Sequence, residues 1–253
     1  MMAKTHAPLS AAVGGAFAFT YMQWGTINNT WSSTAAGNFI DHLSKTMNAA
    51  TSAMTWSQIA LCLIVTMSIG GYALAPDFDE PGATIVKKTG LIGSLLSPLV
   101  RAIAGGHRKG THSVFAVACL SLLGWYAAQN IVSWVFIAAF GCYLSVALVM
   151  GTKKWGIQAV SVALVAIVAY VAYGSITPVI GAAIVGGGAL LHDIEDMIAG
   201  KIKFFWPVTM KVGLDLITTD GPVENMVVRP LANIAVALVL VGTVIVPTAF
   251  QAL

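Results

Sequence analysis

Long apolar runs separated by short polar segments dominate this sequence of 253 residues. Hydrophobic residues make up 57% of the chain and charged residues only 9%, whereas an ordinary soluble domain carries about 25% charged residues. A water-soluble globule needs more polar surface than this, and disordered or disulfide-rich proteins have other compositions. The sequence therefore predicts an integral membrane protein that crosses the bilayer several times.

A membrane-spanning helix needs roughly 20 mostly apolar residues, and somewhat fewer where the bilayer thins. Seven runs meet this criterion loosely, so we expect one all-α domain, residues 1–253, that forms a polytopic transmembrane helical bundle. The expected spans are about 8–23, 58–75, 113–128, 131–150, 156–175, 178–198 and 231–250. The segment 24–57 is rich in Ser, Thr and Asn, and we expect it to be a polar linker.

The lysines and arginines lie almost entirely on one side of this predicted topology. Alternate threading of the seven spans puts all 13 of them except Lys45 on the side of the N-terminus. Because positive loops mark the cytoplasmic side, we expect a multi-pass protein of the cell inner (plasma) membrane with a cytoplasmic N-terminus. The net charge of +3, with its cations confined to loops, argues against nucleic-acid binding.

Residues 85–103, within the 77–112 loop, have the pattern of an amphipathic helix. Lys88 and Arg101 supply a polar side, and we expect the helix to lie in the membrane interface and to bend near Pro98. A re-entrant piece buried in the protein is the alternative. The apolar residues at helical spacing are Ile92, Leu95, Leu96, Leu99, Val100 and Ile103.

Three consecutive glycines, Gly186 to Gly188, lie in the sixth predicted span. Small residues let membrane helices approach closely, so we expect helix packing at this point. A local break in the helix near a functional site is the alternative.

Acidic and imidazole groups at the ends of apolar helices are candidates for function, because charge at membrane depth is costly. The segment Pro76-Asp77-Phe78-Asp79-Glu80-Pro81 follows the second span. Its two aspartates, two residues apart, suit a turn that aims both carboxylates at one cation. A capped turn between two prolines is the alternative.

The segment Gly106-His107-Arg108-Lys109-Gly110-Thr111-His112-Ser113 precedes the third span. Its two histidines are placed to converge on a metal, and the planar guanidinium of Arg108 suits phosphate oxygens. The alternative is a basic interfacial loop that contacts lipid headgroups, with Thr111 or Ser113 as a helix cap.

The sixth span ends with four polar residues in five positions. His192 and Asp196 are four apart on one helical face, a spacing that delivers nitrogen and oxygen ligands to one ion. Asp193 and Glu195 point elsewhere, where they would face water or orient the ligands. A solvated helix end is the alternative, although acids in a last turn oppose the helix dipole and a bound cation would offset this.

The predicted topology places these segments in one layer. The ends of the second and sixth spans, the start of the third, and His6 at the start of the first all fall on the cytoplasmic side. Four of the five histidines therefore share this layer. His42 lies in the opposite loop, where we expect an ordinary surface residue.

The order of these motifs resembles the YdjM-like family of inner-membrane metal-dependent hydrolases. The elements that match are His6, the 76–81 and 106–113 segments, His192 with Asp196, and Trp206-Pro207, while Lys109 and Ala199 depart from the family pattern. This family is distantly similar to zinc-dependent phospholipase C and P1 nuclease. The resemblance thus implies phosphoester hydrolysis with divalent metal, in a protein of bacterial or bacteriophage origin.

The leading hypothesis is a membrane-embedded metal-dependent hydrolase that acts on a phosphoester of a lipid or other amphiphile at the cytoplasmic membrane face. Zinc suits mixed nitrogen and oxygen ligands best, with manganese or iron as alternatives, and the number of ligands suggests two or three ions. The expected ligands are His6, Asp77, Asp79, His107, His112, His192 and Asp196.

The remaining polar groups take catalytic parts in this hypothesis. Arg108, with help from Lys109, would neutralise the developing charge, and Asp77 or Glu195 would act as general base. Two other hypotheses stay open: a non-catalytic membrane protein with a structural metal or anionic-headgroup site, and a transporter.

Overall fold

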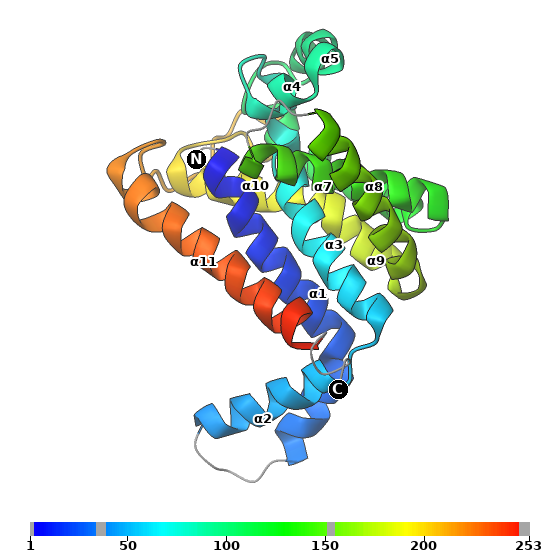
Figure 1. The fold of residues 1–253 in the computed structure, drawn as a ribbon. Coiled ribbons are helices and arrows are strands. Elements are labelled where there is room, and N and C mark those ends of the chain that lie inside the picture. The colour runs from blue at the N-terminus through cyan, green and yellow to red at the C-terminus, as the bar shows by residue number, and fades with distance from the viewer. Residues whose placement is uncertain (1–2, 34–38, 151–154, 248–253) are drawn as a thin grey trace.

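The computed structural model describes residues 3–33, 39–150 and 155–247, and these are almost entirely helical (Figure 1). The expected all-α class is confirmed. An isolated antiparallel bridge joins Ile202 and Val212 in the segment after α10. The helices are α1 (Ala3–Ser33), α2 (Phe39–Ser52), α3 (Trp56–Tyr72), α4 (Thr84–Lys88), α5 (Gly90–Ile103), α6 (Val114–Ala127), α7 (Ile131–Met150), α8 (Trp155–Ala172), α9 (Pro178–Ala182), α10 (Gly188–Ala199) and α11 (Arg229–Leu240). Short 3-10 or π segments are η1 (Ala75–Asp79), η2 (Gly110–His112), η3 (Tyr173–Ser175), η4 (Ala183–Gly187), η5 (Glu224–Val228) and η6 (Val241–Ile245).

Helix α3 forms the centre of the bundle. It packs against α1, α7 and α8, and α11 lies along the other side of α1 (Figure 1). The core is made of apolar side chains from these helices, including Leu61, Ile64 and Trp134, which are fully buried. The start of α1 lies at the same end of the bundle as α4, α5 and α10, and α2 lies at the opposite end (Figure 1).

Helices occupy each of the seven predicted spans in the part of the chain that the structure describes. Within the described residues, two stretches are both long and apolar enough to cross a membrane, namely Trp56–Asp79 and Glu224–Ile245. The first is mostly buried, whereas the second is only 11% buried and exposes large apolar side chains such as Leu231, Ile234 and Leu238. Continuous exposed apolar surface of this kind marks contact with a membrane or a partner. The total of seven spans stays a prediction.

The segment 24–57 is not the polar linker that we expected. Helix α1 continues to Ser33, and α2 follows with its own packing against α1. Thr46 and Ala50 of α2 are buried while Leu43 and Met47 are exposed. Ser, Thr and Asn disfavour helix interiors only weakly, and tertiary packing overrides that preference. The side chain of His42 lies outside the described residues.

The break in the 85–103 segment occurs at a glycine rather than at Pro98. Helix α4 ends at Lys88, and Gly90, with φ of +61°, starts α5 in a conformation that side chains rarely adopt. Helix α5 then runs through Pro98 to Ile103. The expected amphipathic helix is present, but the bend predicted near Pro98 lies eight residues earlier, at Gly90.

The close packing expected at the three glycines of the sixth predicted span is confirmed. A side chain at Gly186 would collide with Ser121 of α6, and one at Gly188 would lie 2.8 Å from the carbonyl oxygen of Ile69 in α3. A local irregularity is present as well, because Gly186 and Gly187 end the π segment η4 and Gly188 begins α10. Such π segments are frequent next to functional sites.

Replacing Gly71 with alanine is expected to destabilise the bundle, because a Cβ there would collide with the backbone of Gly141 where α3 meets α7. Overpacking costs typically 1–3 kcal/mol, which corresponds to a melting temperature lower by roughly 2–12 °C for a chain of this size. Thermal unfolding in detergent measures the change. Gly242→Ala is the matched control, since the space around Gly242 is open, and it should leave the melting temperature unchanged or slightly higher. Equal melting temperatures for the two variants would contradict the packing.

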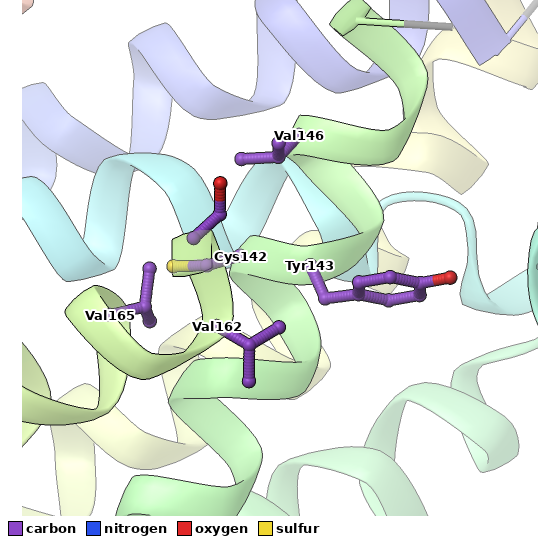
Figure 2. Close-up of a pocket in the computed structure, with 6 residues that line it drawn as sticks. Cys142, Tyr143, Val146, Val162 and Val165 are labelled. Atoms are coloured by element: carbon purple, nitrogen blue, oxygen red, sulfur yellow. The ribbon is translucent and has the colours of Figure 1, made fainter. Parts of the chain in front are cut away.

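A narrow apolar gap of about 10 Å³ lies between α7 and α8 (Figure 2). Cys142, Tyr143 and Val146 line one side, and Val162 and Val165 the other. It has room for at most one water molecule. This gap therefore carries no candidate site, and the candidate residues lie at the polar end of the bundle.

Candidate metal centre

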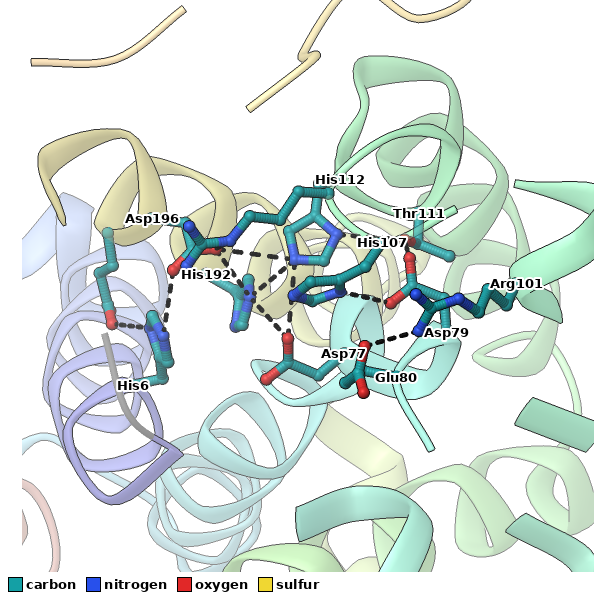
Figure 3. A network of polar contacts seen from close by, with 12 residues as sticks. His6, Asp77, Asp79, Glu80, Arg101, His107, Thr111, His112, His192 and Asp196 are labelled. Carbon is teal, nitrogen blue, oxygen red and sulfur yellow. Dashed lines mark hydrogen bonds and ion pairs between the residues drawn. The ribbon is translucent and has the colours of Figure 1, made fainter. Parts of the chain in front are cut away.

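Four segments far apart in the sequence meet at the polar end of the bundle (Figure 3). Helix α10 contacts α1 on one side and η1 on the other, and η1 contacts η2. These contacts bring together all seven side chains that the sequence predicts as metal ligands: His6, Asp77, Asp79, His107, His112, His192 and Asp196. The layer expected from the predicted topology is therefore present in the structure.

His6 from α1 forms one end of the cluster. Its Nδ1 atom donates a hydrogen bond to Glu195 Oε2 at 2.5 Å, and Ser10, one turn further along α1, donates to the other carboxylate oxygen at 3.0 Å. In the neutral imidazole, a proton on Nδ1 leaves the lone pair on Nε2, which lies 3.5 Å from Asp196 Oδ1. The ring stacks on His192, with centroids 4.1 Å apart.

His107 forms the other end and is held in the same manner. Its Nδ1 atom donates to Asp79 Oδ1 at 2.8 Å, and the opposite side of its ring faces the centre of the cluster (Figure 3). The hydrogen bond to the Asp79 carboxylate raises the pKa of His107 above its ordinary value, against the opposing effect of burial. Both oxygens of Asp79 are engaged, because Thr111 donates to Oδ2 at 2.5 Å.

The Thr111 hydroxyl links Asp79 to a second histidine. Since its proton points to Asp79, the hydroxyl oxygen accepts a hydrogen bond from His112 Nδ1, at 3.1 Å. His112 therefore presents the unprotonated Nε2 atom to the cluster. One buried carboxylate thus orients two imidazoles, His107 directly and His112 through Thr111.

The two central histidines face each other. His112 Nε2 and His192 Nε2 are 3.2 Å apart, and Asp77 Oδ1 lies 3.7 Å from each of them. Asp196 Oδ2 approaches from the other side, 3.7 Å from His112 Nε2 and 3.9 Å from His192 Nε2. Four potential ligand atoms converge here on one point.

This donor set fits a divalent cation. Ligand atoms at about 2.0–2.1 Å from a tetrahedral zinc ion lie roughly 3.3–3.4 Å from one another, which is close to the observed spacings. The ligand atoms form two groups, each with two histidines and one aspartate within 4.8 Å of one another: His6, His192 and Asp196, and Asp77, His107 and His112. Mixed imidazole and carboxylate donors suit zinc, manganese and iron.

Arg108 lies over one side of the cluster. Its Nε atom is 3.1 Å from Asp196 Oδ2, and its side chain is one-third exposed. The residue has φ of +58°, a costly conformation without glycine, and its carbonyl oxygen accepts a hydrogen bond from the Lys203 amide at 3.2 Å. Lys109 instead donates to the Gly105 carbonyl oxygen at 2.6 Å, within its own loop.

The acidic residues at the end of α10 do not face water. Asp193 is fully buried and Glu195 is 3% exposed, which rules out the solvated helix end. Both carboxylate oxygens of Glu195 accept hydrogen bonds, one from His6 and the other from Ser10. These contacts fit a role in orienting His6 better than a role as general base. Among the described residues, neither carboxylate oxygen of Asp193 has a hydrogen-bond partner.

The cluster opens at its Asp77 and His107 end. Side chains of Asp77 and His107 are 23% and 29% exposed, whereas those of His6, His112, His192 and Asp196 are at most 2% exposed. The partly exposed side of the cluster is therefore the side of Asp77, His107 and Arg108.

Two functional contacts were missed in the sequence. Ser10 had a usable signal, since it lies four residues after His6 and so shares its helical face. For Thr111, which directly precedes His112, the sequence predicts only a helix cap. The residues around Thr111 do not predict its hydrogen bond to Asp79, because Asp79 lies 32 residues away in the sequence.

Comparison with family models decides where the chain belongs, because residues 1–252 match the model described as YdjM inner membrane protein. The chain belongs to this family. Membership agrees with the expected membrane location, while the number of crossings and the cytoplasmic N-terminus stay predictions. No curated protein and no solved structure matched the chain.

Proposed function

We propose that the protein is a membrane-embedded metal-dependent hydrolase that cleaves a phosphoester of a lipid or other amphiphile at the cytoplasmic membrane face. The observation that supports this most strongly is the pair of ligand groups, each with two histidines and one aspartate. Glu195 and Asp79 orient the outer histidines, which is the arrangement of carboxylates behind histidine ligands in metalloproteins.

Six side chains would hold two divalent ions, zinc best suited among them. His6, His192 and Asp196 serve one ion, and Asp77, His107 and His112 the other. Divalent ions supply Lewis-acid chemistry, which polarises a phosphoryl oxygen and makes water a stronger nucleophile at neutral pH. Asp79 and Glu195 would fix the histidine tautomers, so that His6, His107 and His112 would each present Nε2 to an ion.

The chain's other groups have roles around the phosphoester. Arg108, at the open side, would bind phosphoryl oxygens with its planar guanidinium and stabilise the charge that develops on them. Asp77 is the better candidate for the general base, because it is partly exposed and contacts the histidines through Oδ1. The partial exposure of this end supports catalysis over a structural metal, which favours a closed set of protein ligands.

Hydrolysis by the purified, zinc-loaded protein in detergent tests this proposal. Phosphatidic acid offers a phosphomonoester and phosphatidylglycerol a phosphodiester, and release of phosphate or headgroup measures turnover. We expect hydrolysis of at least one lipid, lost in Asp77→Asn and kept in Glu80→Gln, whose carboxylate pairs with Arg101 at the surface. Metal-loaded protein that hydrolyses neither lipid nor a soluble aryl phosphate would favour the non-catalytic headgroup or structural-metal hypothesis.

A further inference from the structure

Helix α5 leaves one complete face without protein contacts among the described residues. Its buried residues, Gly93 and Ser97, lie on the opposite side, and Arg101 joins the rest of the protein through Glu80 at 2.7 Å. The helix stands at the end of the bundle that carries the metal centre (Figure 1). The apolar side chains on this free face are between 43% and 75% exposed. They are Leu91, Ile92, Leu95, Leu96, Leu99 and Ile103.

Residues 205–216 form a second segment with exposed apolar side chains. The backbone preceding it is fixed against the site, because the Val114 amide donates to the Phe204 carbonyl oxygen at 2.8 Å. Further along, the Leu216 amide donates to the carbonyl oxygen of Ile198 in α10 at 2.8 Å. The exposed apolar side chains of this segment are Phe205, Val208, Met210, Leu214 and Leu216.

These two segments flank the turn that carries the most exposed residues of the metal centre. Helix α5 ends at Ile103, just before the Gly105 and Gly106 turn that leads to His107. The Trp206 indole nitrogen lies 3.8 Å from the place of a Cβ on Gly105. The turn that leads to His107 therefore follows α5 directly along the chain and lies next to Trp206 of the second apolar segment.

The charge around these surfaces is strongly positive. In residues 80–103 and 201–216 the acidic residues are Glu80 and Asp215 alone. The cations of the same two stretches are Lys87, Lys88, Arg101, Lys201, Lys203 and Lys211. Apolar side chains flanked by lysine and arginine fit the boundary between acyl chains and anionic headgroups.

We propose that α5 and residues 205–216 form a membrane-contact surface that lies in the headgroup layer of an anionic leaflet and holds the open end of the metal centre at lipid phosphate level. Charge complementarity favours a lipid surface over a second protein. Residues 205–216 are also followed along the chain by the apolar stretch Glu224–Ile245, which is long enough to cross the membrane. The inference for the substrate, a phosphate group on an anionic lipid, rests on the proposed function.

Spin labels on single cysteines test the membrane contact directly. Cysteine replaces Leu95, Leu214 or, as control, Ser94, which is exposed on the polar side of α5. The background carries alanine at Cys62, Cys119 and Cys142. Labelled protein is reconstituted in phosphatidylcholine vesicles and in an equal mixture of phosphatidylcholine and phosphatidylglycerol, and collisions with oxygen and with a water-soluble nickel complex are measured.

We expect labels at positions 95 and 214 to collide severalfold more with oxygen, relative to nickel, than the label at position 94. The difference should be larger in the anionic vesicles. Equal ratios at the three positions, or protection from both reagents at 95 and 214, would overturn the proposal in favour of water or a protein partner. Thermal unfolding of each labelled protein confirms that it is folded, and a position that fails is replaced by its neighbour Leu99 or Leu216.

The readout does not depend on catalysis. Collision ratios report where the surface lies even when the protein hydrolyses nothing, so failure of the hydrolase proposal leaves the membrane contact standing. Conversely, hydrolysis of a soluble aryl phosphate with equal collision ratios would keep the hydrolase and overturn both the membrane contact and the lipid substrate.

Discussion

Asp196→Ala is expected to lower phosphoester hydrolysis at least about a hundredfold, since bound metal ions supply several kcal/mol of transition-state stabilisation. The Asp196 carboxylate lies within 4 Å of ring nitrogens of His6, His112 and His192. It also pairs with the guanidinium of Arg108. Its loss removes a metal ligand and leaves the guanidinium of Arg108 without its carboxylate. Initial rates of the zinc-loaded variant, normalised to folded protein, measure the effect.

Glu80→Gln is the matched control for this experiment. Glu80 lies in the same layer but pairs with Arg101 at the surface, where an ion pair contributes little, about 0–1 kcal/mol. The control should keep the wild-type rate. Asp196→Ala protein that hydrolyses substrate at the control rate would remove Asp196 from the site.

Asp79→Ala is expected to weaken metal binding by about 10–100-fold, the usual effect of losing a carboxylate behind histidine ligands. Asp79 holds His107 directly and His112 through Thr111, so its removal frees two imidazoles at once. Competition with a fluorescent zinc chelator measures the affinity without any need for turnover. An unchanged affinity would show that the two histidines do not depend on Asp79.

Variants at Thr111 show how much of the loss in zinc affinity arises from His112, which Asp79 orients through Thr111, and how much from His107, which Asp79 contacts directly. Thr111→Val removes only the hydroxyl link to His112 and should weaken zinc binding less than Asp79→Ala does. Thr111→Ser keeps the hydroxyl and should restore nearly the wild-type affinity. A purely steric role for Thr111 predicts the opposite order, with valine close to the wild type and serine weaker.

The sequence was sufficient to predict the elements that bring the site together. Apolar runs marked the helices, and the positions of His6, Asp77, His112 and His192 at helix ends followed from the order of those runs. The contacts of these side chains across the bundle agree with that prediction, because helix ends on one side of a membrane are held at similar depth.

Other features depend on tertiary contacts that carry no local pattern. Within the described part of residues 24–57, helix α2 packs on α1, and this tertiary contact is not visible in the local sequence. Asp77 faces the central histidines, whereas Asp79 orients His107. The direction of each carboxylate depends on the conformation of a short turn. The sequence spacing does not distinguish the two aspartates, so their different contacts are known only from the structure.

Elemental analysis of the detergent-purified protein is the most direct test of the central claim, which is that this cluster binds divalent metal. The protein should carry about two equivalents of zinc or manganese, as expected for a two-metal site. The His107→Ala/His192→Ala double variant, with one histidine removed from each ligand group, should lose them while keeping its fold. Absence of bound transition metal after reconstitution with zinc, manganese or iron, or equal metal content in wild type and variant, would contradict the account.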